Sequence, residues 1–396
     1  MSTDLDFAEL RRWPDLEADN LFAVDASDRL ILDEAAPFLA DAALGAGAGA
    51  GAGAGTVAIL GDNYGALTLG AIANHHARGV RVHQDLLTGE RALAANAKPL
   101  GLSAEYVQHP LGEALLTGAK VVLMQIPRTL DELDEWAEAI ARYADPAVIL
   151  VAGGRIKHLT PTMNPVLLRH FETLDVSLAR QKSRVLIART PKAEVPLEES
   201  VHPHREYHRD LGLWLCSHGS TFAGSSVDIG TRLLLSVLRK ATPDAKVIID
   251  LGCGSGVLAA AAASARPGAK VIATDQSASA VASAQATMAA NELSDRVVVV
   301  RDDGLIDQPD ESADLILLNP PFHVGATVHT GQALRMFEDA ERVLRPGGSL
   351  WTVFNTHLGY RQALAGIVGP TELVTHNAKF TVTESIKPLV PVRVSP

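Results

Sequence analysis

The sequence has little cysteine and no long apolar run. Only two of its 396 residues are cysteine, Cys216 and Cys253, which excludes a disulfide framework and indicates a reducing compartment. No apolar stretch is long enough to cross a bilayer, and Met1 to Glu9 carries acids where a signal peptide would be apolar. We therefore predict a cytoplasmic protein without membrane contact.

The sequence also lacks an excess of positive charge. Its net charge of −11 excludes binding of nucleic acid through an overall positive charge, although it does not exclude a local basic face. Two basic clusters occur, made of Arg180, Lys182, Arg184, Arg189 and Lys192, and of His202, His204, Arg205, His208 and Arg209. Composition favours a solvated face for them, and the alternative is a strip that contacts phosphates between two domains. The histidines show no metal-ligand spacing, so we expect no metal.

What is present fits a soluble globular chain with room for two domains, since 47% of the residues are hydrophobic and 20% charged. A strict Gly-Ala alternation covers residues 45–55. This run precedes an apolar strand, whereas a phosphate-binding loop follows one. We interpret it as a low-complexity insertion.

Strand and helix signals alternate in the second half of the chain. Such alternation predicts a doubly wound, mainly parallel α/β sheet. Predicted strands are 246–250, 270–274, 297–300, 315–318 and 349–354, and an antiparallel strand at 380–382 closes the sheet. Predicted helices are 257–265, 277–291, 331–344 and 360–367, with a further helix ending near Lys240 and a turn at 345–348.

A glycine-rich loop follows the first of these strands. Asp250 precedes Gly252, Cys253, Gly254 and Gly256, a Gly-x-Gly-x-Gly spacing that differs from dinucleotide and triphosphate loops. Glycines there let the backbone approach a ligand near a helix start.

Acids follow the next two strands of the predicted sheet. Asp275 is placed to hold two ribose hydroxyls, and Asp303, or alternatively Asp302, to accept from an adenine amine. Asp250 would accept from the amino group of a methionine moiety. Each acid alone is more simply a helix cap. Together with the glycine loop they predict S-adenosylmethionine as the cofactor.

The most informative motif is Asn319-Pro320-Pro321-Phe322, after the strand at 315–318. The Asn319 side-chain oxygen and the Pro320 carbonyl can each accept a hydrogen from a planar amine, next to the cofactor. Phe322 offers a face for stacking, and His323 either contacts substrate or caps the loop. Cys253 is a small loop residue in this interpretation. Guanine, adenine and cytosine amines, or a glutamine amide, all satisfy this chemistry.

The first half of the chain repeats the pattern in weakened form. Residues 57–65 align with 248–256, 121–127 with 316–321, and 147–151 with 348–354, and Asp85 lies at about the spacing of Asp275. Ile59 then stands for Asp250, and Gln125 for Asn319. We predict tandem Rossmann-like methyltransferase domains from a duplication, with a degenerate N-terminal copy at 1–192 and a catalytic domain at 193–396.

The chain resembles the ribosomal RNA guanine-N(2) methyltransferases of the RsmC and RlmG type. The resemblance covers nearly the whole length and is carried by residues 228–234, 250–256, 319–323 and 377–380. In the N-terminal half, residues 61–67 and 126–130 look more like the large-subunit (23S) branch than the small-subunit (16S) branch.

The resemblance implies methyl transfer to the exocyclic amine of a guanine in ribosomal RNA, or in a ribosomal subunit. It implies that Asn319 and Pro320 position the amine and that Phe322 stacks the base. The stretch from Thr221 through Phe222 to Asp228 would help to close the site. Alternatives are a 16S enzyme, a protein glutamine methyltransferase and a non-enzymatic RNA-binding assembly factor.

Overall fold

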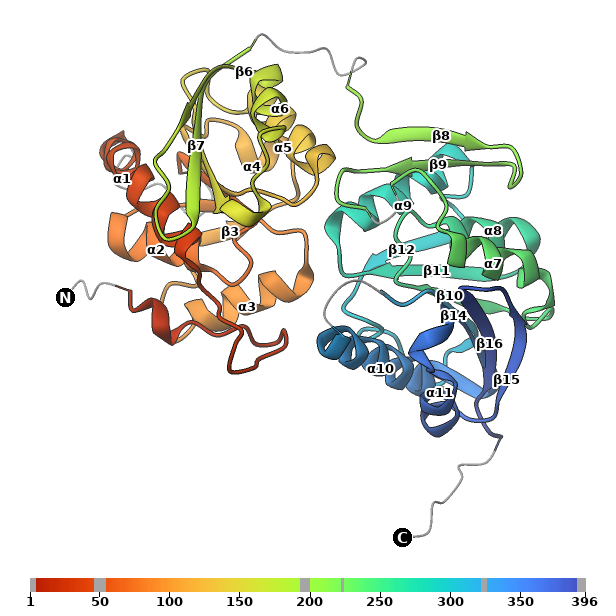
Figure 1. Cartoon of the computed structure of the whole chain (residues 1–396). Helices are drawn as coiled ribbons and strands as arrows, with labels where there is room; N and C mark the ends of the chain where they lie inside the picture. Colours follow the sequence, from red (N-terminus) through yellow and green to blue (C-terminus); the bar gives the residue numbers. More distant parts are fainter. Residues whose placement is uncertain (1–4, 46–54, 193–199, 222–223, 322–325, 390–396) are drawn as a thin grey trace. The chain divides into compact units, whose positions relative to one another are not determined.

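The computed structural model describes residues 5–45, 55–192, 200–221, 224–321 and 326–389. Within it the chain folds into two compact units, Met1–His202 and Pro203–Pro396 (Figure 1). Most of the Gly-Ala run, residues 46–54, lies outside the described residues. No helix of the described segments is long and apolar enough to cross a membrane.

The N-terminal unit is built on one seven-stranded sheet with the strand order β3-β2-β1-β4-β5-β7-β6. The five strands from β3 to β5 are parallel, and β7 is antiparallel to both of its neighbours. Its strands are β1 (Val57–Leu60), β2 (Val80–His83), β3 (Tyr106–Gln108), β4 (Val121–Gln125), β5 (Ile149–Arg155), β6 (Phe171–Val176) and β7 (Ser183–Pro191). Its helices are α1 (Ala26–Gly45), α2 (Ala66–His75), α3 (Leu87–Ala97), α4 (Glu113–Leu116), α5 (Leu130–Tyr143) and α6 (Met163–His170), with short 3₁₀ turns at Phe7–Glu9 and Ile156–His158.

The C-terminal unit has a seven-stranded sheet in the corresponding order, β12-β11-β10-β13-β14-β16-β15. A separate antiparallel hairpin, β8 paired with β9, precedes it. The strands are β8 (His204–His208), β9 (Leu213–Ser217), β10 (Val247–Leu251), β11 (Lys270–Asp275), β12 (Val297–Arg301), β13 (Ala313–Leu318), β14 (Leu344–Asn355), β15 (Thr371–His376) and β16 (Phe380–Ile386). The helices are α7 (Ile229–Val237), α8 (Val257–Ala265), α9 (Ala278–Ala290), α10 (Ala326–Val343) and α11 (Arg361–Ile367), with 3₁₀ turns at Leu238–Lys240 and Thr356–Leu358.

Helices cover both faces of each sheet because successive strand residues point to opposite sides. In β10, Ile248 packs with α7, α8 and α9, whereas Ile249 packs with α10 and α11. In β1, Ile59 faces α1, α2 and α3, and Ala58 faces α4, α5 and α6. Continuous apolar strands such as 247–249 are therefore buried on both sides, as parallel strands in such sheets are.

The α/β architecture and the parallel strands of the C-terminal unit confirm the sequence prediction, whereas one predicted turn was wrong and two elements were missed. The expected turn at 345–348 is part of β14, whose pairing with β13 shifts register between Ala313 and Leu315. The hairpin β8–β9 and the edge strand β15 were not predicted. Strand β8 is almost entirely polar, and β15 has only two apolar residues, side by side, so neither shows the apolar-polar alternation that identifies a strand.

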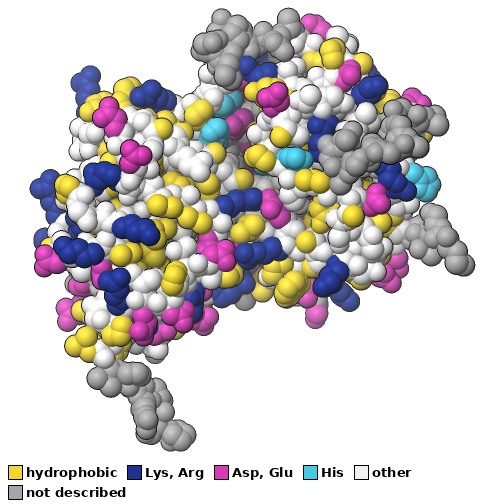
Figure 2. All heavy atoms as spheres, turned by 180° about the vertical axis from the view of Figure 1, so that it is seen from behind, with side chains coloured by type: hydrophobic (Ala, Val, Ile, Leu, Met, Phe, Trp, Pro, Cys, Tyr) yellow, Lys and Arg dark blue, Asp and Glu magenta, His cyan; other side chains and the backbone are white. Residues whose placement is uncertain are grey.

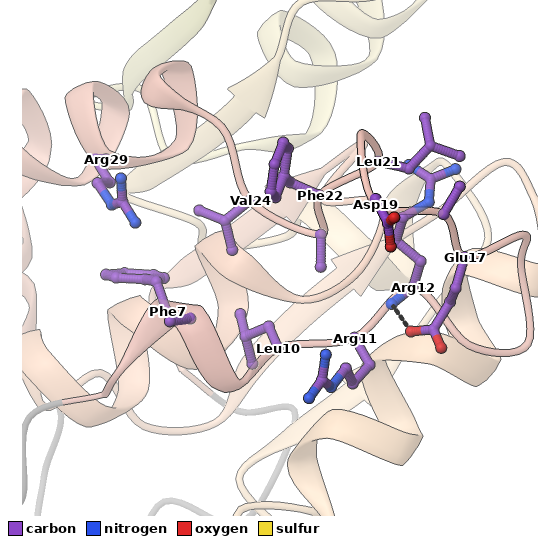
Figure 3. Close-up of a pocket in the computed structure, with 13 residues that line it drawn as sticks. Phe7, Leu10, Arg11, Arg12, Glu17, Asp19, Leu21, Phe22, Val24 and Arg29 are labelled. Atoms are coloured by element: carbon purple, nitrogen blue, oxygen red, sulfur yellow. Dashed lines mark hydrogen bonds between the residues drawn. The ribbon is translucent and has the colours of Figure 1, made fainter.

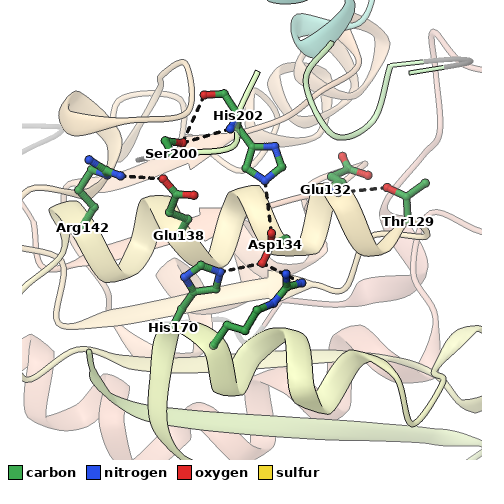
Figure 4. A network of polar contacts seen from close by, with 9 residues as sticks. Thr129, Glu132, Asp134, Glu138, Arg142, His170, Ser200 and His202 are labelled. Carbon is green, nitrogen blue, oxygen red and sulfur yellow. Dashed lines mark hydrogen bonds and ion pairs between the residues drawn. The ribbon is translucent and has the colours of Figure 1, made fainter. Parts of the chain in front are cut away.

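A polar cluster ties residues 200–202 to helix α5 (Figure 4). Asp134 accepts from His170 Nε2 at 2.7 Å and lies 3.1 Å from Arg169 and 3.5 Å from His202 Nε2. Burial alone would raise the pKa of Asp134, but its hydrogen bonds to His170 and His202 hold it below the usual range. Burial would lower the pKa of His202, yet Asp134 and Glu135 raise it. This cluster fixes the last residues of the N-terminal unit.

Candidate active site

The candidate site lies at the carboxyl edge of the C-terminal sheet. Strand β10 pairs in parallel with β11 on one side and β13 on the other, so the loops that follow all three strands emerge together. This is the edge at which open α/β sheets bind ligands. The glycine loop, Asp275 and Asn319 are brought together here.

The glycine loop has the backbone that its sequence predicts. Gly252, Gly254 and Gly256 have φ values of 72°, 52° and 78°, in the left-handed region that favours glycine. The amides of Gly252 and Cys253 donate to the Thr274 carbonyl at 2.8 and 2.9 Å, which fastens the loop to β11. A Cβ on Gly256 would lie 3.0 Å from that of Ala284, so only glycine lets α8 start this close to α9.

Asp250 is 1% exposed at the end of β10. Its Oδ2 accepts from the Ala259 amide at 2.9 Å, in the first turn of α8. Its Oδ1 is buried and has no hydrogen-bond partner among the described residues. Burial, together with the charge of Asp275, raises the pKa of Asp250 to about 7. A buried acceptor of this kind is suited to a hydrogen-bond donor that arrives with a ligand.

The acids after β11 and β12 differ in accessibility. Asp275 is half-buried and accepts from the amides of Gly254 and Ser277, each at 3.0 Å. Asp302 is fully buried and accepts from the Asp307 amide at 3.1 Å, and burial raises its pKa. Asp303 is half-exposed, so of the two it is the acid that a ligand can reach.

Cys253 is 6% exposed. Burial raises the pKa of its thiol well above the usual value, and the charges of Asp275 and Asp250 add to this effect. A thiol of this kind stays protonated at neutral pH, and the thiolate is the nucleophile. The geometry therefore gives Cys253 a packing role in the loop.

Asn319 has a defined orientation at the end of β13. Its Nδ2 donates to Thr231 Oγ1 at 2.8 Å and to Asp228 Oδ2 at 3.3 Å. A carboxylate accepts only, so this contact fixes which end of the amide is nitrogen. The Asn319 Oδ1 is then a buried acceptor without a partner among the described residues. Pro320 is buried, and Phe322 and His323 lie outside the described residues.

The segment before α7 holds Asn319 in place. Asp228 begins α7 and accepts from the amides of Gly230 and Thr231 at 2.8 and 3.2 Å, while also accepting from Asn319. Thr221 is 7% exposed, and its hydroxyl lies 2.7 Å from Ser283 Oγ. The predicted substrate contacts at Asp228 and Thr221 are thus anchoring contacts in this geometry. Phe222 lies outside the described residues.

Thr231 is a site residue that the motif search missed. The signal was available in the sequence, because Asp228-Ile-Gly-Thr231-Arg-Leu matches Asp25-Ala-Ser-Asp28-Arg-Leu in the first half. The structure gives both stretches the same task. Gln125, at the end of β4, donates to Asp28 and Ser27, as Asn319 at the end of β13 donates to Thr231 and Asp228.

The carboxyl edge of the N-terminal sheet has a different chemistry. Its strand register sets Ile59 at the position of Asp250 and Gln125 at that of Asn319. The same register sets Gln84, not Asp85, at the position of Asp275. Asp62 accepts from the amides of Leu67 and Thr68 at 2.6 and 2.9 Å, so both its oxygens are used in capping α2.

The chain's own N-terminal segment lies against this edge. The Arg12 guanidinium stacks on the Tyr64 ring at 4.5 Å, and the Tyr64 hydroxyl donates to Asp15 at 2.6 Å. The Asn96 side chain donates to the carbonyls of Arg11 and Tyr64, both at 2.8 Å. Tyr64, in the loop that corresponds to the glycine loop, is therefore bound to Arg12 and Asp15 of the N-terminal segment.

Beside this segment the N-terminal unit has a hollow of about 580 Å³ (Figure 3). Its lining contains apolar side chains and charged side chains of both signs. The lining residues are Phe7, Ala8, Leu10, Arg11, Arg12, Glu17, Ala18, Asp19, Leu21, Phe22, Ala23, Val24 and Arg29. It does not include the residues of the carboxyl edge of β10, β11 and β13.

The remaining polar groups of the described residues form no metal cluster, and those seen in Figure 2 form no continuous basic face. No group of three His, Cys, Asp or Glu in the described segments could hold a metal ion. Basic and acidic side chains alternate over the surface seen in Figure 2. Arg180 and Arg189, from the first basic cluster, pair with Asp33 and Asp175.

The fold, the glycine loop and the Asn-Pro-Pro motif define a methyltransferase domain. The family model "Methyltransferase small domain" matches residues 212–384, and the model "RLMG N-terminal domain" matches residues 1–193. The chain resembles in fold the T. thermophilus 16S rRNA N2-guanine methyltransferase RsmC, whose structure was solved with AdoMet and guanosine. That likeness has a TM-score of 0.68 at 22% identity and covers 88% of this chain and 91% of RsmC.

Whole-length relatives narrow the assignment further. "Ribosomal RNA large subunit methyltransferase G" of Streptomyces coelicolor is 34% identical over 390 residues, which is 96% of this chain and 97% of the relative. The protein of that name from Ectopseudomonas mendocina is 35% identical over 381 residues, again 96% and 97%. The chain belongs to the ribosomal RNA large subunit methyltransferase G family.

Proposed function

We propose that the protein transfers a methyl group from S-adenosylmethionine to the exocyclic 2-amino group of a guanine in 23S ribosomal RNA. The observation that carries this proposal is the oriented Asn319, whose Oδ1 is a buried acceptor beside the glycine loop. Family membership over the whole chain supports the substrate class and the large-subunit branch. The likeness to RsmC supports the fold on which this chemistry is placed.

The residues of the carboxyl edge fit S-adenosylmethionine. The vacant Oδ1 of Asp250 suits an ammonium donor, the glycine loop admits a ligand against the backbone, and Asp275 and Asp303 suit ribose hydroxyls and an adenine amine. The cofactor, when bound, supplies an electrophilic methyl group. The cofactor-binding assignments of Asp250, Gly252, Cys253, Gly254, Gly256, Asp275, Asp303 and Asn319 are proposals of this kind. We assign Asp302 to the support of the loop before Asp307.

Asn319 and Pro320 orient the amine in this proposal. Two carbonyl-type acceptors take its two hydrogens, which leaves the nitrogen lone pair directed away from them and toward the cofactor. As the nitrogen gains positive charge, the same two acceptors would stabilise it, and the methylated nitrogen would then lose one proton to solvent. Asp228 and Thr231 act as positioning residues because they hold the Asn319 amide nitrogen. We further propose that Phe322 stacks on the guanine and that Phe222 and His323 border it.

The N-terminal unit keeps the fold without the chemistry. We propose that both units derive from a duplication and that the N-terminal copy, residues 1–192, is degenerate and serves structure or substrate recognition. Matching strand order, the shared Asp25 and Asp228 motifs, and the replacement of Asp250 by Ile59 support this. The catalytic domain would then be residues 193–396. Such an enzyme works in the cytoplasm, on ribosomal RNA or a ribosomal subunit.

The test is methylation of undermethylated ribosomal RNA by the full chain and by Asn319→Ala, with a labelled methyl donor and mapping of the modified nucleosides. We expect label on the guanine 2-amino group of large-subunit RNA and almost none with the variant. Label on small-subunit RNA would favour a 16S enzyme, and label on protein a glutamine methyltransferase. Label on adenine, or equal label with Asn319→Ala, would refute the proposed chemistry. Cofactor titration in the absence of RNA separates an enzyme from an assembly factor.

A further inference from the structure

The hairpin β8–β9 exposes an aromatic and cationic cluster that the proposed active site does not use. Tyr207 and Trp214 are directly opposed across the two strands, with ring centroids 5.1 Å apart. The Arg205 guanidinium lies 4.3 Å from the centroid of the Trp214 ring. The exposed fractions of Tyr207 and Trp214 are 46% and 36%, and their ring planes are tilted by 49° to each other. The cluster is a partly solvated aromatic surface on one side of a two-stranded ribbon.

The ribbon is held rigidly against helix α9. Leu213 and Leu215 are buried in the core of the C-terminal unit. The Asn291 side chain accepts from the Trp214 amide at 2.9 Å and donates to the Trp214 carbonyl at 2.7 Å. Further along, the Cys216 amide donates to Thr287 Oγ1 at 3.0 Å. A surface fixed in this way needs little ordering when it binds a partner.

The charge available on the hairpin is positive. Asp210 pairs with Arg232, and Glu206, which accepts from Ser225 Oγ, points to the other face of β8 from Arg205 and Tyr207. Arg205 and Arg209 have no carboxylate partner among the described residues. A cationic surface with exposed aromatic rings complements phosphates and stacked bases.

Helix α9 sets the distance between this cluster and the candidate active site. The C-cap of the helix is Asn291, beside Trp214, and its N-cap is Ser277, two residues after Asp275. Its thirteen residues span about 20 Å at 1.5 Å per residue. A group bound at Trp214 is therefore not the reacting base, but one several nucleotides along the same strand.

We propose that the Arg205–Tyr207–Trp214 face of the hairpin binds an unpaired stretch of RNA that flanks the target guanine. This inference rests on the proposed function and adds to it a surface that binds the RNA substrate outside the active site. Bases stack on Trp214 and Tyr207, and Arg205 and Arg209 contact the phosphates. An unpaired strand fits because its bases are free to stack, and because aromatic stacking needs no particular sequence.

The test compares Trp214→Ala, Trp214→Phe and Arg205→Gln with the unchanged full chain, using the KM for undermethylated ribosomal RNA. Losing a stacked base should raise the KM about tenfold for Trp214→Ala, with kcat unchanged, and Trp214→Phe should restore most of the loss. Arg205→Gln should lower the slope of log affinity against log salt by about one, for a single-stranded oligoadenylate probe. Matched controls are Leu373→Ala, 48% exposed on edge strand β15, and the exposed Arg239→Gln.

Thermal unfolding and cofactor affinity of every variant should match the unchanged protein, which separates binding from folding. Unchanged KM and probe affinity in Trp214→Ala would overturn the inference, provided that the unchanged protein methylates RNA. Absence of methylation by the unchanged protein refutes the proposed function instead. If Trp214→Ala loses activity on the assembled subunit but binds naked RNA normally, the face binds a ribosomal protein and the RNA proposal is wrong.

Discussion

The carboxyl edges of the two sheets have the same strand order, but their polar side chains differ in the hydrogen bonds that they make. At the N-terminal edge, both oxygens of Asp62 accept hydrogen bonds from helix amides, and the Gln125 oxygen lies 3.3 Å from the Ser27 hydroxyl. At the C-terminal edge, Asp250 and Asn319 each keep one buried oxygen without a partner among the described residues. The Gln108 amide, at the end of β3, also lacks a partner among the described residues, so the contrast concerns Asp250 and Asn319 and not every group of the edge. Unmet buried acceptors cost stability, and those of Asp250 and Asn319 lie where the proposed ligand would complete them.

The largest effect should come from Asn319→Gln, which gives the C-terminal edge the residue of the N-terminal one. The longer side chain moves the acceptor away from the position set by Thr231 and Asp228. We expect kcat to fall about 10²- to 10³-fold, as when one oriented hydrogen-bonding group is lost from a transition-state site. Cofactor affinity, measured by calorimetric titration, should change little. A variant of nearly normal kcat would show that the orientation of Asn319 is unimportant.

Asp250→Asn should weaken cofactor binding about tenfold to hundredfold, because a charged hydrogen bond to the ligand is lost. The pKa of about 7 also predicts that cofactor affinity of the unchanged protein falls as the pH drops below 7, where the carboxyl is protonated. In Asp250→Asn this pH dependence should be absent. Equal pH profiles for the two proteins, in titrations from pH 5.5 to about 8.5, would exclude an ammonium contact at Asp250.

The same raised pKa makes a stability prediction of known sign. The unfolded carboxyl has a pKa of about 3.9, so the neutral form favours folding fully below about pH 4. That contribution is lost as the pH rises through about 7. Asp250→Asn, neutral at every pH, should therefore gain Tm relative to the unchanged protein more at pH 8 than at pH 5.

In the N-terminal unit, Asp134→Asn should lower the free energy of unfolding by about 3 kcal/mol, since it leaves buried histidines without their partner. Because the pKa of Asp134 is lowered, its carboxylate stabilises the fold fully above pH 3.8. This stabilisation is lost only as the pH falls through the lowered pKa. Because the pKa of His202 is raised, its charged ring stabilises the fold fully below pH 6.5. This stabilisation is lost as the pH rises through the raised pKa. The stability difference should therefore shrink in alkaline buffer. Asp175→Asn, which breaks an exposed ion pair with Arg189 in the same unit, is the control and should cost less than 1 kcal/mol.

The smallest effect should come from Asp62→Ala, which removes a helix cap from the N-terminal edge. We expect a loss of about 1 kcal/mol in unfolding free energy, with kcat and cofactor affinity unchanged. Urea unfolding and single-turnover methylation measure both quantities. A large fall in kcat would show that the two edges are not as different as their contacts indicate.

Much of the catalytic half was predictable because its signals are local. The glycine loop, the apolar strands and the Asn-Pro-Pro motif each occupy a few consecutive residues, and the structure sets them at one sheet edge. The hairpin β8–β9 was missed because His204 to His208 is almost entirely polar, and only the packing of Leu213 and Leu215 makes it a ribbon. Asp85 was placed wrongly because spacing along the chain does not include the strand register that selects Gln84.

The sequence by itself determined the class of chemistry: an acid before Gly-x-Gly-x-Gly, acids after two further strands, and an amide acceptor before two prolines. Only the tertiary structure decided which way the Asn319 amide faces, because its nitrogen donates to Asp228 and Thr231, about ninety residues earlier in the chain. It also decided that Thr221 anchors a loop and that Asp302 is fully buried, whereas Asp303 is only half-buried. Such assignments depend on burial and on long-range hydrogen bonds, which no stretch of consecutive residues contains.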